Sequence, residues 1–249
     1  MSVVEFRSRI DHVADHFGKH LAFTGLIPTV DQMYQCVRIV AQRHFPLDMG
    51  KLLMLSHREF LVGCNLLQCG LPLDAGANTR RAIEIARLAL AVKRDRANAE
   101  KWMQGEKRQE RWDARQDGER PKNLPPLQWP EIDNDPLFAP LKDYFGMYSD
   151  TFVHFTPEFI GQQHFDERPS QDGVAIINLR YFSSDRMVIQ NAITICGIHG
   201  KILGVFDACF DNMVSNDGGW KMLKATFDQL GADLWKQLPP DDAADAEGR

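Results

Sequence analysis

The sequence lacks the short motifs that identify many enzymes and cofactor-binding proteins. It contains no GxxxxGK[ST] phosphate loop, no GxGxxG dinucleotide fingerprint and no GxSxG nucleophile turn. Its five cysteines are odd in number, form no CxxC pair and stand mostly in apolar runs. Zinc binding by a cysteine cluster and a disulfide framework are therefore not predicted, and the pattern is typical of reduced, buried thiols in a cytosolic protein.

The chain also lacks a net positive charge. There are 29 lysines and arginines against 34 aspartates and glutamates, a formal net charge of −5. A basic field over the whole protein, as expected for nucleic-acid binding, is thus absent. Residues 93–122 hold ten basic and seven acidic residues, with Trp102 and Trp112 between them. This segment leaves nucleic acid open as a partner, although mixed charges of this density are usual on a solvated helix.

Long hydrophobic runs are missing as well. The first residues, MSVVEFRSRIDHVADH, are charged throughout, so no secretory signal is expected there. The most apolar window, Met187–Phe206, contains Gln190, Asn191, His199 and Lys201. Polar residues at these positions favour a buried helix over a membrane span, and we expect a soluble cytoplasmic protein that binds no membrane.

Apolar residues recur with helical spacing through most of the chain. We therefore predict an all-α fold, a single bundle of about seven helices over residues 1–238. The exceptions are a proline-rich connector at 118–136, a small β-hairpin inserted near 162–183 and a disordered acidic tail at 239–249. Short loops between the first four helices predict antiparallel neighbours.

Proline and glycine mark the expected helix ends. Pro28 is expected to stop the first helix, with Thr29 capping the second, and Gly70 followed by Pro72 should end the third. The fourth helix begins near Asp74 and has a pattern that continues as far as Gln116.

The stretch TRRAIEIARLALAVKR raises the first question about function. Arg80, Glu84 and Arg87 share one polar face and are spaced for i,i+4 and i,i+3 pairs, as on an ordinary solvated helix. Arg81 instead falls beside Ile85 on the apolar side, where a guanidinium needs an acceptor or must extend along the surface. Arg80, Arg81 and Glu84 are therefore candidate ligand-binding residues, while a purely structural role is the more common one.

This stretch and the later YSDTFVHFTP resemble an uncharacterised group of bacterial helical proteins. Its members carry an Arg-x3-Glu helix, a downstream tryptophan and a later histidine segment. The corresponding residues here are Arg80, Glu84, Trp102 and His154. The resemblance adds His154 to the ligand-binding candidates and carries no activity with it.

More distantly, the group is similar to the HEPN class of helical bundles, some of which are dimeric ribonucleases marked by Arg-x4–6-His. Arg38 and His44 have this spacing near the end of a helix. In such a site the arginine would hold a phosphate and the histidine would move a proton, whereas the alternative is a basic helix end that complements the helix dipole. Arg7–His12 and Arg9–His16 match the spacing too, so spacing alone does not select a pair.

Two further histidine patterns bear on chemistry. Asp150 and His154 are four residues apart, so the carboxylate could fix the tautomer of the imidazole, as in half of an acid–base pair. His12, His16 and His20 form an HxxxHxxxH series, but its stripe drifts around a straight helix and aims poorly at one ion. We expect no metal and no cofactor, and the catalytic candidates are Arg38, His44, Asp150 and His154.

Small residues recur four apart along the sixth expected helix. The ridge is formed by Ala192, Cys196, Gly200, Gly204 and Ala208. Repeated glycine in a helix destabilises it, which indicates that another helix approaches closely, from the same chain or from a second copy. The sequence thus favours a homodimeric protein that binds a partner or small ligand, with a HEPN-like ribonuclease or toxin of bacterial stress or phage defence as the alternative.

Overall fold

A computed structural model describes residues 2–44, 47–97, 130–152, 165–169, 175–179 and 183–238. Side chains are described in these ranges except at 42–44, 47, 130–131, 150–152 and in the two strands. The described part is dominated by helices, which confirms the predicted all-α bundle. The expected tail at 239–249 and the connector residues 118–129 lie outside it.

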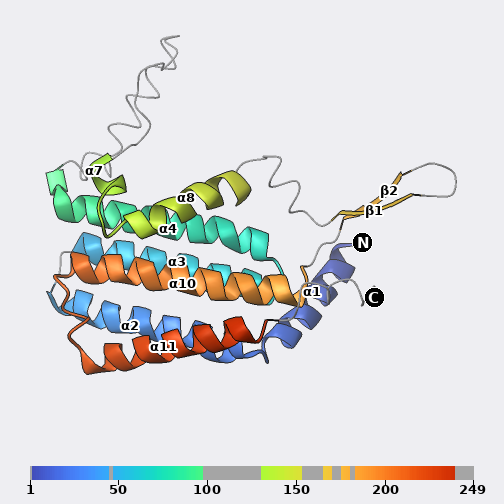
Figure 1. Ribbon diagram of the computed structural model, residues 1–249, viewed down its shortest axis with the longest axis horizontal. Coiled ribbons are helices and arrows are strands. Elements are labelled where there is room, and N and C mark those ends of the chain that lie inside the picture. Colours follow the sequence, from blue (N-terminus) through green and yellow to red (C-terminus); the bar gives the residue numbers. More distant parts are fainter. Residues whose placement is uncertain are drawn as a thin grey trace, which may run out of the picture.

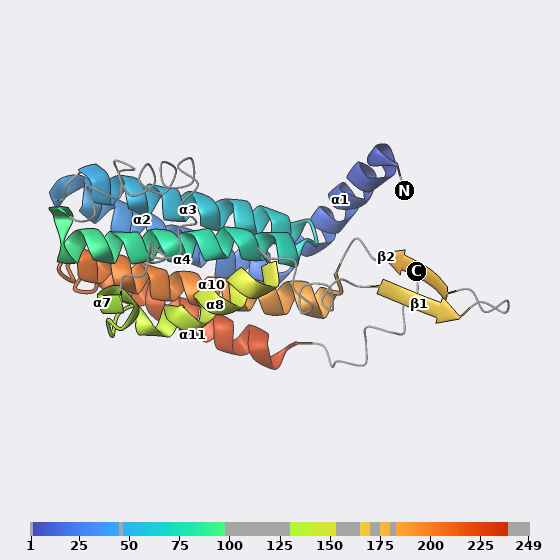
Figure 2. The same cartoon turned by 90° about the horizontal axis from the view of Figure 1, so that it is seen from above.

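The chain begins with α1 (Val3–Phe17), which starts at a capping box between Ser2 and Glu5. The Ser2 hydroxyl accepts from the Glu5 amide at 3.3 Å, and the Ser2 amide donates to the Glu5 carboxylate at 2.6 Å. Phe17 is its buried residue. α1 extends away from the long bundle (Figure 2).

The expected break at Pro28 is wrong. A π-helical segment, η1 (Ala22–Leu26), runs directly into α2 (Ile27–His44), and the amide of Ile27 bonds to the carbonyl of Ala22 five residues back. Proline lacks the N–H of a regular turn, and the wider π turn accommodates that loss. Thr29 is no cap, because its hydroxyl donates to the Gly25 carbonyl at 2.8 Å.

The predicted end of the third helix is confirmed. After α3 (Leu47–Gln68), Gly70 adopts φ 76°, its amide bonds to the Leu67 carbonyl at 2.9 Å, and the Leu71 amide bonds to that of Leu66 at 2.9 Å. This is a Schellman motif, for which glycine is the favoured residue. Pro72 then opens α4 (Pro72–Arg94), where its missing N–H costs nothing.

The fourth helix is shorter than its pattern suggested. α4 ends at Arg94, and Asp95 is extended at φ −147° and ψ 96°, so a continuous helix to Gln116 is wrong. The short helix α7 (Pro130–Asp133) and α8 (Ala139–Phe152) follow in the next described segment. The side chain of Asp135 caps the turn between them by accepting from the amide of Leu137 at 2.9 Å.

Two strands precede the last helices. β1 (Phe165–Pro169) pairs antiparallel with β2 (Ala175–Leu179), with Phe165 opposite Leu179. The chain continues as α10 (Asp185–Cys209), capped by the Ser184 hydroxyl, and α11 (Gly218–Lys236), capped by the Asp217 carboxylate.

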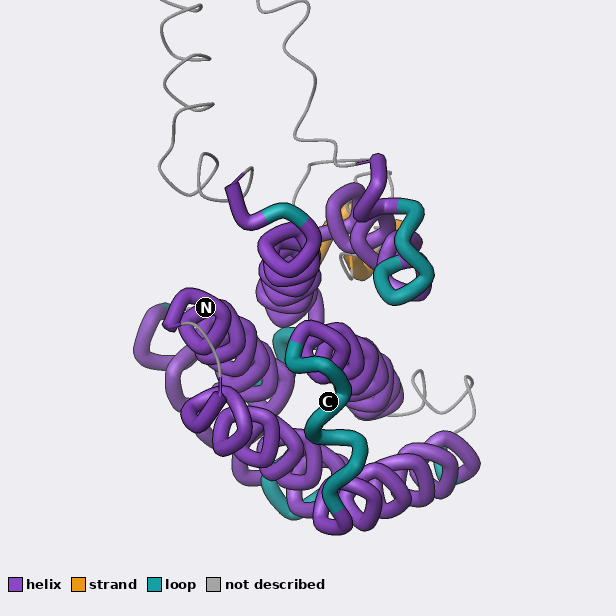
Figure 3. Tube along the Cα trace, turned by 90° about the vertical axis from the view of Figure 1, so that its left-hand side faces the viewer, coloured by secondary structure: helices purple, strands orange, loops and turns teal. Residues whose placement is uncertain are grey.

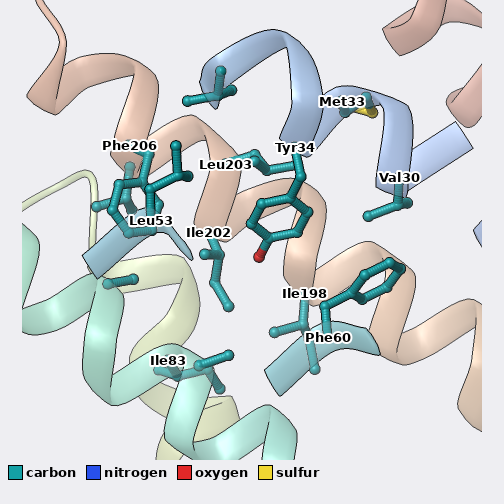
Figure 4. Packing of buried hydrophobic residues seen from close by; sticks show 14 of the residues in the cluster. Val30, Met33, Tyr34, Leu53, Phe60, Ile83, Ile198, Ile202, Leu203 and Phe206 are labelled. Carbon is teal, nitrogen blue, oxygen red and sulfur yellow. The ribbon is translucent and has the colours of Figure 1, made fainter. Parts of the chain in front are cut away.

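The helices pack around one apolar core. α3 and α4 make the most extensive contact, α10 packs on α4, α2 and α3, and α11 packs on α2. Figure 1 shows α3 and α10 between α4 with α8 on one side and α2 with α11 on the other. Fully buried side chains from four helices meet in the centre (Figure 4): Met33, Tyr34, Leu53, Phe60, Ile83, Ile198, Ile202, Leu203 and Phe206. Burial of this apolar surface is the main source of stability.

α10 is long and apolar enough, by length and composition alone, to cross a membrane, and it is the helix of the described part for which this holds. However, 61% of that apolar window is buried within the bundle. The core helix of a water-soluble protein has the same properties, and the predicted buried helix at Met187–Phe206 is confirmed as such.

Candidate functional site

The candidate residues Arg80 and Arg81 on α4 reach toward different helices. Arg80 donates from Nε to the hydroxyl of Ser149 on α8 at 2.7 Å and lies 3.3 Å from Glu84. Arg81 donates to the carboxylate of Glu59 on α3 at 2.9 Å and to the side-chain oxygen of Asn78. The structure therefore joins Arg80 with Glu84, and it places Arg81 in a separate cluster.

The arginine side chains of α4 have the reverse of the exposure that the sequence predicted. The side chains of Arg80 and Arg87, expected on a solvated face, are only 22% and 11% exposed, whereas that of Arg81 is 52% exposed. α8 packs over the polar row of α4, and both Arg80 and Arg87 stack on the ring of Phe145, at 4.9 and 6.0 Å from its centre. Arg87 also pairs with Asp133 at 2.6 Å. The buried member of the Arg81 pair is Glu59, at 7% exposed.

The catalytic candidates are only partly within the described residues. Arg38 is exposed on α2, and His44 is the last residue of that helix, with a side chain outside the described part. Asp150 belongs to α8, and its side chain is likewise outside. His154 lies outside the described residues altogether, so its approach to Arg80 and Glu84 stays a prediction.

The three histidines of the HxxxHxxxH series have separate surroundings. His12 is exposed, His16 pairs with Asp185 at 2.9 Å, and the ring of His20 accepts from the Ala22 amide at 3.1 Å. Among the described residues, no group of three or more potential metal ligands is brought together.

A buried polar cluster that the sequence did not predict joins α2, α3 and α10. The phenol of Tyr34 lies 2.7 Å from Nδ1 of His199 and 3.0 Å from the hydroxyl of Ser56, and all three residues are at most 1% exposed. Figure 4 shows the Tyr34 hydroxyl directed inward, toward the side of α10 that carries Ile198 and Ile202. Burial raises the pKa of Tyr34 above its usual value.

Burial sets the charge of His199, and the hydrogen bonds of this cluster fit one tautomer of its neutral ring. Burial, with a smaller effect of nearby His57, lowers the pKa of His199 to about 3, so the ring is neutral at pH 7. If Nδ1–H donates to Tyr34 and Tyr34 donates to Ser56, both protons are satisfied. Only the lone pair of Nε2, which has no partner among the described residues, is then left over.

The cluster approaches the surface through His57 on α3. Its ring stacks on Tyr34 at 4.7 Å between centres, and its Nε2 lies 2.6 Å from the carboxylate of Asp31. The His57 side chain is 13% exposed and that of Asp31 is 38% exposed. A row of polar groups thus runs from solvent to the bundle centre.

A cavity does occur at the end of the bundle where α3 begins and α4 and α10 end. Its volume is about 310 Å³, and it is lined by Asp48, Met49, Val92, Lys93, Arg96, Cys209 and Asp211. Figure 3 looks onto this end, where the chain connecting α10 and α11 crosses between helices. The apolar members lie deepest, since Met49 and Cys209 are 5% and 2% exposed, and charged side chains surround the opening.

The charged groups at the opening form ion pairs, one of which joins Asp48 to Lys51 on the same helix at 3.8 Å. Lys93 lies 2.6 Å from Asp211, and Arg96 lies 3.7 Å from Asp48. Asp211 is held by the turn after α10, where its φ is 55°, a conformation that aspartate tolerates better than most residues. The buried carboxylate of Asp207 fixes that turn by accepting from the amides of Val214 and Ser215 at 2.9 and 3.2 Å.

Cys209 at the floor of this cavity is not a reactive thiol. Burial raises its pKa to about 12, so the neutral thiol is the form present at pH 7. All five cysteines are free, and Cys64, Cys196 and Cys209 are buried, as the sequence suggested. A neutral, buried thiol behaves as a small apolar side chain.

The small-residue ridge of α10 is partly covered by the same chain. A Cβ placed on Gly200 would lie 3.3 Å from the ring of Phe227 on α11, so this glycine permits the close approach of α11. Gly204 is exposed, and nothing lies within 4 Å of a Cβ built there.

The sequence carried a signal for the buried cluster but not for the cavity. A buried histidine needs a polar partner, so His199 within the apolar stretch Met187–Phe206 could have indicated the cluster, and the partner is Tyr34. The cavity combines residues near 48, 92–96 and 209–211, whose meeting depends on how three helix ends come together.

No family model, no curated protein and no solved structure matches this chain.

Proposed function

We propose that this protein is a helical-bundle binding protein that holds a small molecule in the cavity between the start of α3 and the ends of α4 and α10. The observation that carries the proposal is the combination of an apolar floor, formed by Met49, Val92 and Cys209, with charged groups at the opening. Small-molecule sites are typically concave, mainly apolar and equipped with a few polar groups that orient the ligand. The volume of about 310 Å³ is at the lower end of their usual range, roughly 300–1,000 Å³.

The chemistry of the lining supports binding more than thiol catalysis. The one nucleophile type at the floor is Cys209, whose raised pKa keeps it protonated. The charged groups at the opening are paired with one another, as expected for groups that exchange partners when a ligand arrives.

A thermal-shift series with small apolar probes tests this proposal. Indole and phenol should raise the melting temperature of the wild type in a saturable manner. Val92→Phe and Met49→Phe fill the cavity and should abolish that shift while the helical circular dichroism is retained. The matched control is Ile193→Phe, a half-buried site on α10 sixteen residues before Cys209 and thus about 24 Å away, which should keep the shift. No shift in the wild type, or equal shifts in all variants, would contradict the proposal.

We further propose that the chain forms a homodimer through the α10 ridge, works in the cytoplasm and carries its hairpin as an insertion near 162–183. The exposed Gly204 leaves room on the ridge for a second helix. Light scattering of the wild type and of Gly204→Leu tests the dimer, because a leucine at the interface should favour the monomer.

The alternative function is a HEPN-like ribonuclease or toxin, in line with the resemblance to uncharacterised bacterial helical proteins. It is supported by the exposed position of Arg38 on α2, six residues before His44 at the end of that helix. Expression of the wild type should then slow growth and degrade RNA, and Arg38→Ala or His44→Ala should relieve both effects. Unchanged growth and intact RNA would exclude this function.

A further inference from the structure

The four charged groups around the cavity are arranged as two cations and two anions from different elements. Lys93 and Arg96 come from the end of α4 and the residues that follow it, whereas Asp48 comes from the start of α3 and Asp211 from the turn after α10. The side chains are between 36% and 68% exposed. The opening is therefore formed by charges of both signs.

This arrangement discriminates between classes of ligand. A ligand with a single negative charge that binds Lys93 displaces Asp211 and makes no use of that carboxylate. A ligand with a single positive charge that binds Asp211 displaces Lys93 and makes no use of that ammonium group. A zwitterion offers a carboxylate to the cations and an ammonium group to the aspartates, so both signs of charge at the opening gain a contact.

The existing ion pairs are suited to such an exchange. The Arg96–Asp48 separation of 3.7 Å is long for a direct hydrogen bond, and both side chains are substantially exposed. Exposed ion pairs contribute little to stability, so opening them for a ligand opposes binding only weakly. The αL conformation of Asp211 holds its carboxylate at the opening independently of the flexible Lys93 side chain.

The apolar floor of the cavity determines which kind of tail the ligand can carry. Met49, Val92 and the protonated thiol of Cys209 offer apolar surface, and the thiol is at most a weak hydrogen-bond donor. A polar tail placed there would lose its water without replacement, whereas an unbranched or aromatic apolar tail would fill the space.

We propose that this site binds a small zwitterion with an apolar tail, of the kind represented by a free α-amino acid with a hydrophobic side chain. Its carboxylate binds at Lys93 and Arg96, its ammonium group at Asp48 and Asp211, and its tail lies against Met49, Val92 and Cys209. The inference rests on the proposed function and adds the chemical class of the ligand.

Calorimetric titration with three matched ligands tests the class. L-Norleucine carries both charges, hexanoate lacks the ammonium group, and 1-aminopentane lacks the carboxylate, while all three have a linear apolar tail. Norleucine should bind the wild type at pH 7 roughly tenfold or more tightly than either of the others, since it makes charge-assisted contacts with both signs of charge at the opening and each analogue makes only one of the two. Binding of hexanoate or 1-aminopentane as tight as that of norleucine, or no binding of norleucine, would overturn the proposal.

Two variants test which side chains bind the ammonium group and the carboxylate of the ligand. Asp211→Asn keeps a residue that tolerates the αL conformation, and it should lower the affinity for norleucine toward that for hexanoate. Arg96→Gln should lower it toward that for 1-aminopentane. Asp228→Asn is the matched control, because it removes an exposed carboxylate that pairs with Lys224 on α11, and it should leave all three affinities unchanged.

The two proposals fail in different ways. If indole binds the wild type but not Val92→Phe, while norleucine has no advantage over its singly charged analogues, the cavity is a binding site and the zwitterion proposal is wrong. If neither indole nor any of the three matched ligands binds, both proposals are wrong. Equal loss of norleucine affinity in Asp228→Asn and Asp211→Asn would also overturn the charge assignment.

Discussion

Tyr34 on α2 and His199 on α10 share a hydrogen bond of 2.7 Å between the phenol oxygen and Nδ1, in the centre of the bundle. Neither side chain is exposed to solvent, and Phe60 packs against both rings, at 5.7 Å from Tyr34 and 4.8 Å from His199 between centres. The pair fixes two helices that are 165 residues apart in the sequence. Burial away from water favours the neutral ring of His199.

Acid should destabilise the protein through His199. Its pKa is about 3 in the folded state, against an ordinary value of 6.5 for a solvated histidine. Between these limits the unfolded chain binds more protons, so stability falls as the pH falls. We expect a loss of about 2 kcal/mol from this group between pH 7 and pH 5.

Urea unfolding at both pH values measures this loss of unfolding free energy. His199→Gln should lack this loss, and His12→Gln, at an exposed site, should keep it. The same pH dependence in both variants would contradict the prediction.

Removing the Tyr34 hydroxyl should cost more than removing that of a comparable tyrosine. Tyr34→Phe leaves the Nδ1 atom of His199 and the Ser56 hydroxyl without their partner in the core, and we expect a loss of about 1–3 kcal/mol. Tyr144→Phe on α8 keeps the ring that Lys201 stacks on, so its effect should be small. Chemical denaturation of the two variants provides the measurement, and equal losses would exclude a special role for the phenol.

The Arg81–Glu59 pair should show strong coupling despite the exposure of Arg81. Arg81→Ala leaves a carboxylate that is only 7% exposed with Arg58 as its remaining cationic partner, and we expect a loss of about 1–2 kcal/mol. The double variant Glu59→Gln/Arg81→Ala should recover part of that loss, because the buried charge is removed. A double-mutant cycle measures the coupling, and strict additivity would show that the pair contributes nothing.

The two glycines of the α10 ridge should respond differently to alanine. Gly204→Ala meets no atom of its own chain within 4 Å, so at concentrations where the chain is monomeric it should stabilise the helix by about 0.5–1 kcal/mol. Gly200→Ala places its methyl group 3.3 Å from the Phe227 ring, so the gain should be reduced or reversed. Thermal unfolding compares the two, and a larger gain at Gly200 would contradict the packing of α11 on this ridge.

Most helices could be predicted from the sequence because their signals are local. Apolar spacing defines α10 and α11, and Gly70 with Pro72 ends α3 at the expected place through backbone geometry that only nearby residues determine. The break predicted at Pro28 was wrong because a π turn can accommodate a proline. Such a turn depends on the tertiary packing that keeps η1 and α2 in one line.

The site residues were harder to predict because their surroundings come from distant elements. A helical wheel assigns Arg80 and Arg87 to solvent, but it contains no information on α8, whose Phe145 and Ser149 cover them. The same wheel puts Arg81 on the apolar side, whereas the buried group is its partner Glu59 on α3. The cavity is further removed from sequence patterns, since its lining joins the ends of three helices.

Binding of indole followed by methyl NMR tests the central claim, that the cavity at the end of α4 is a small-molecule site. The methyl signal of Met49, which lines the cavity and is 5% exposed, should shift in a saturable manner as indole is added. The signal of Met222 on α11, which is 70% exposed, should stay in place. A Met49 signal that does not move, or that drifts linearly together with Met222, would contradict the account.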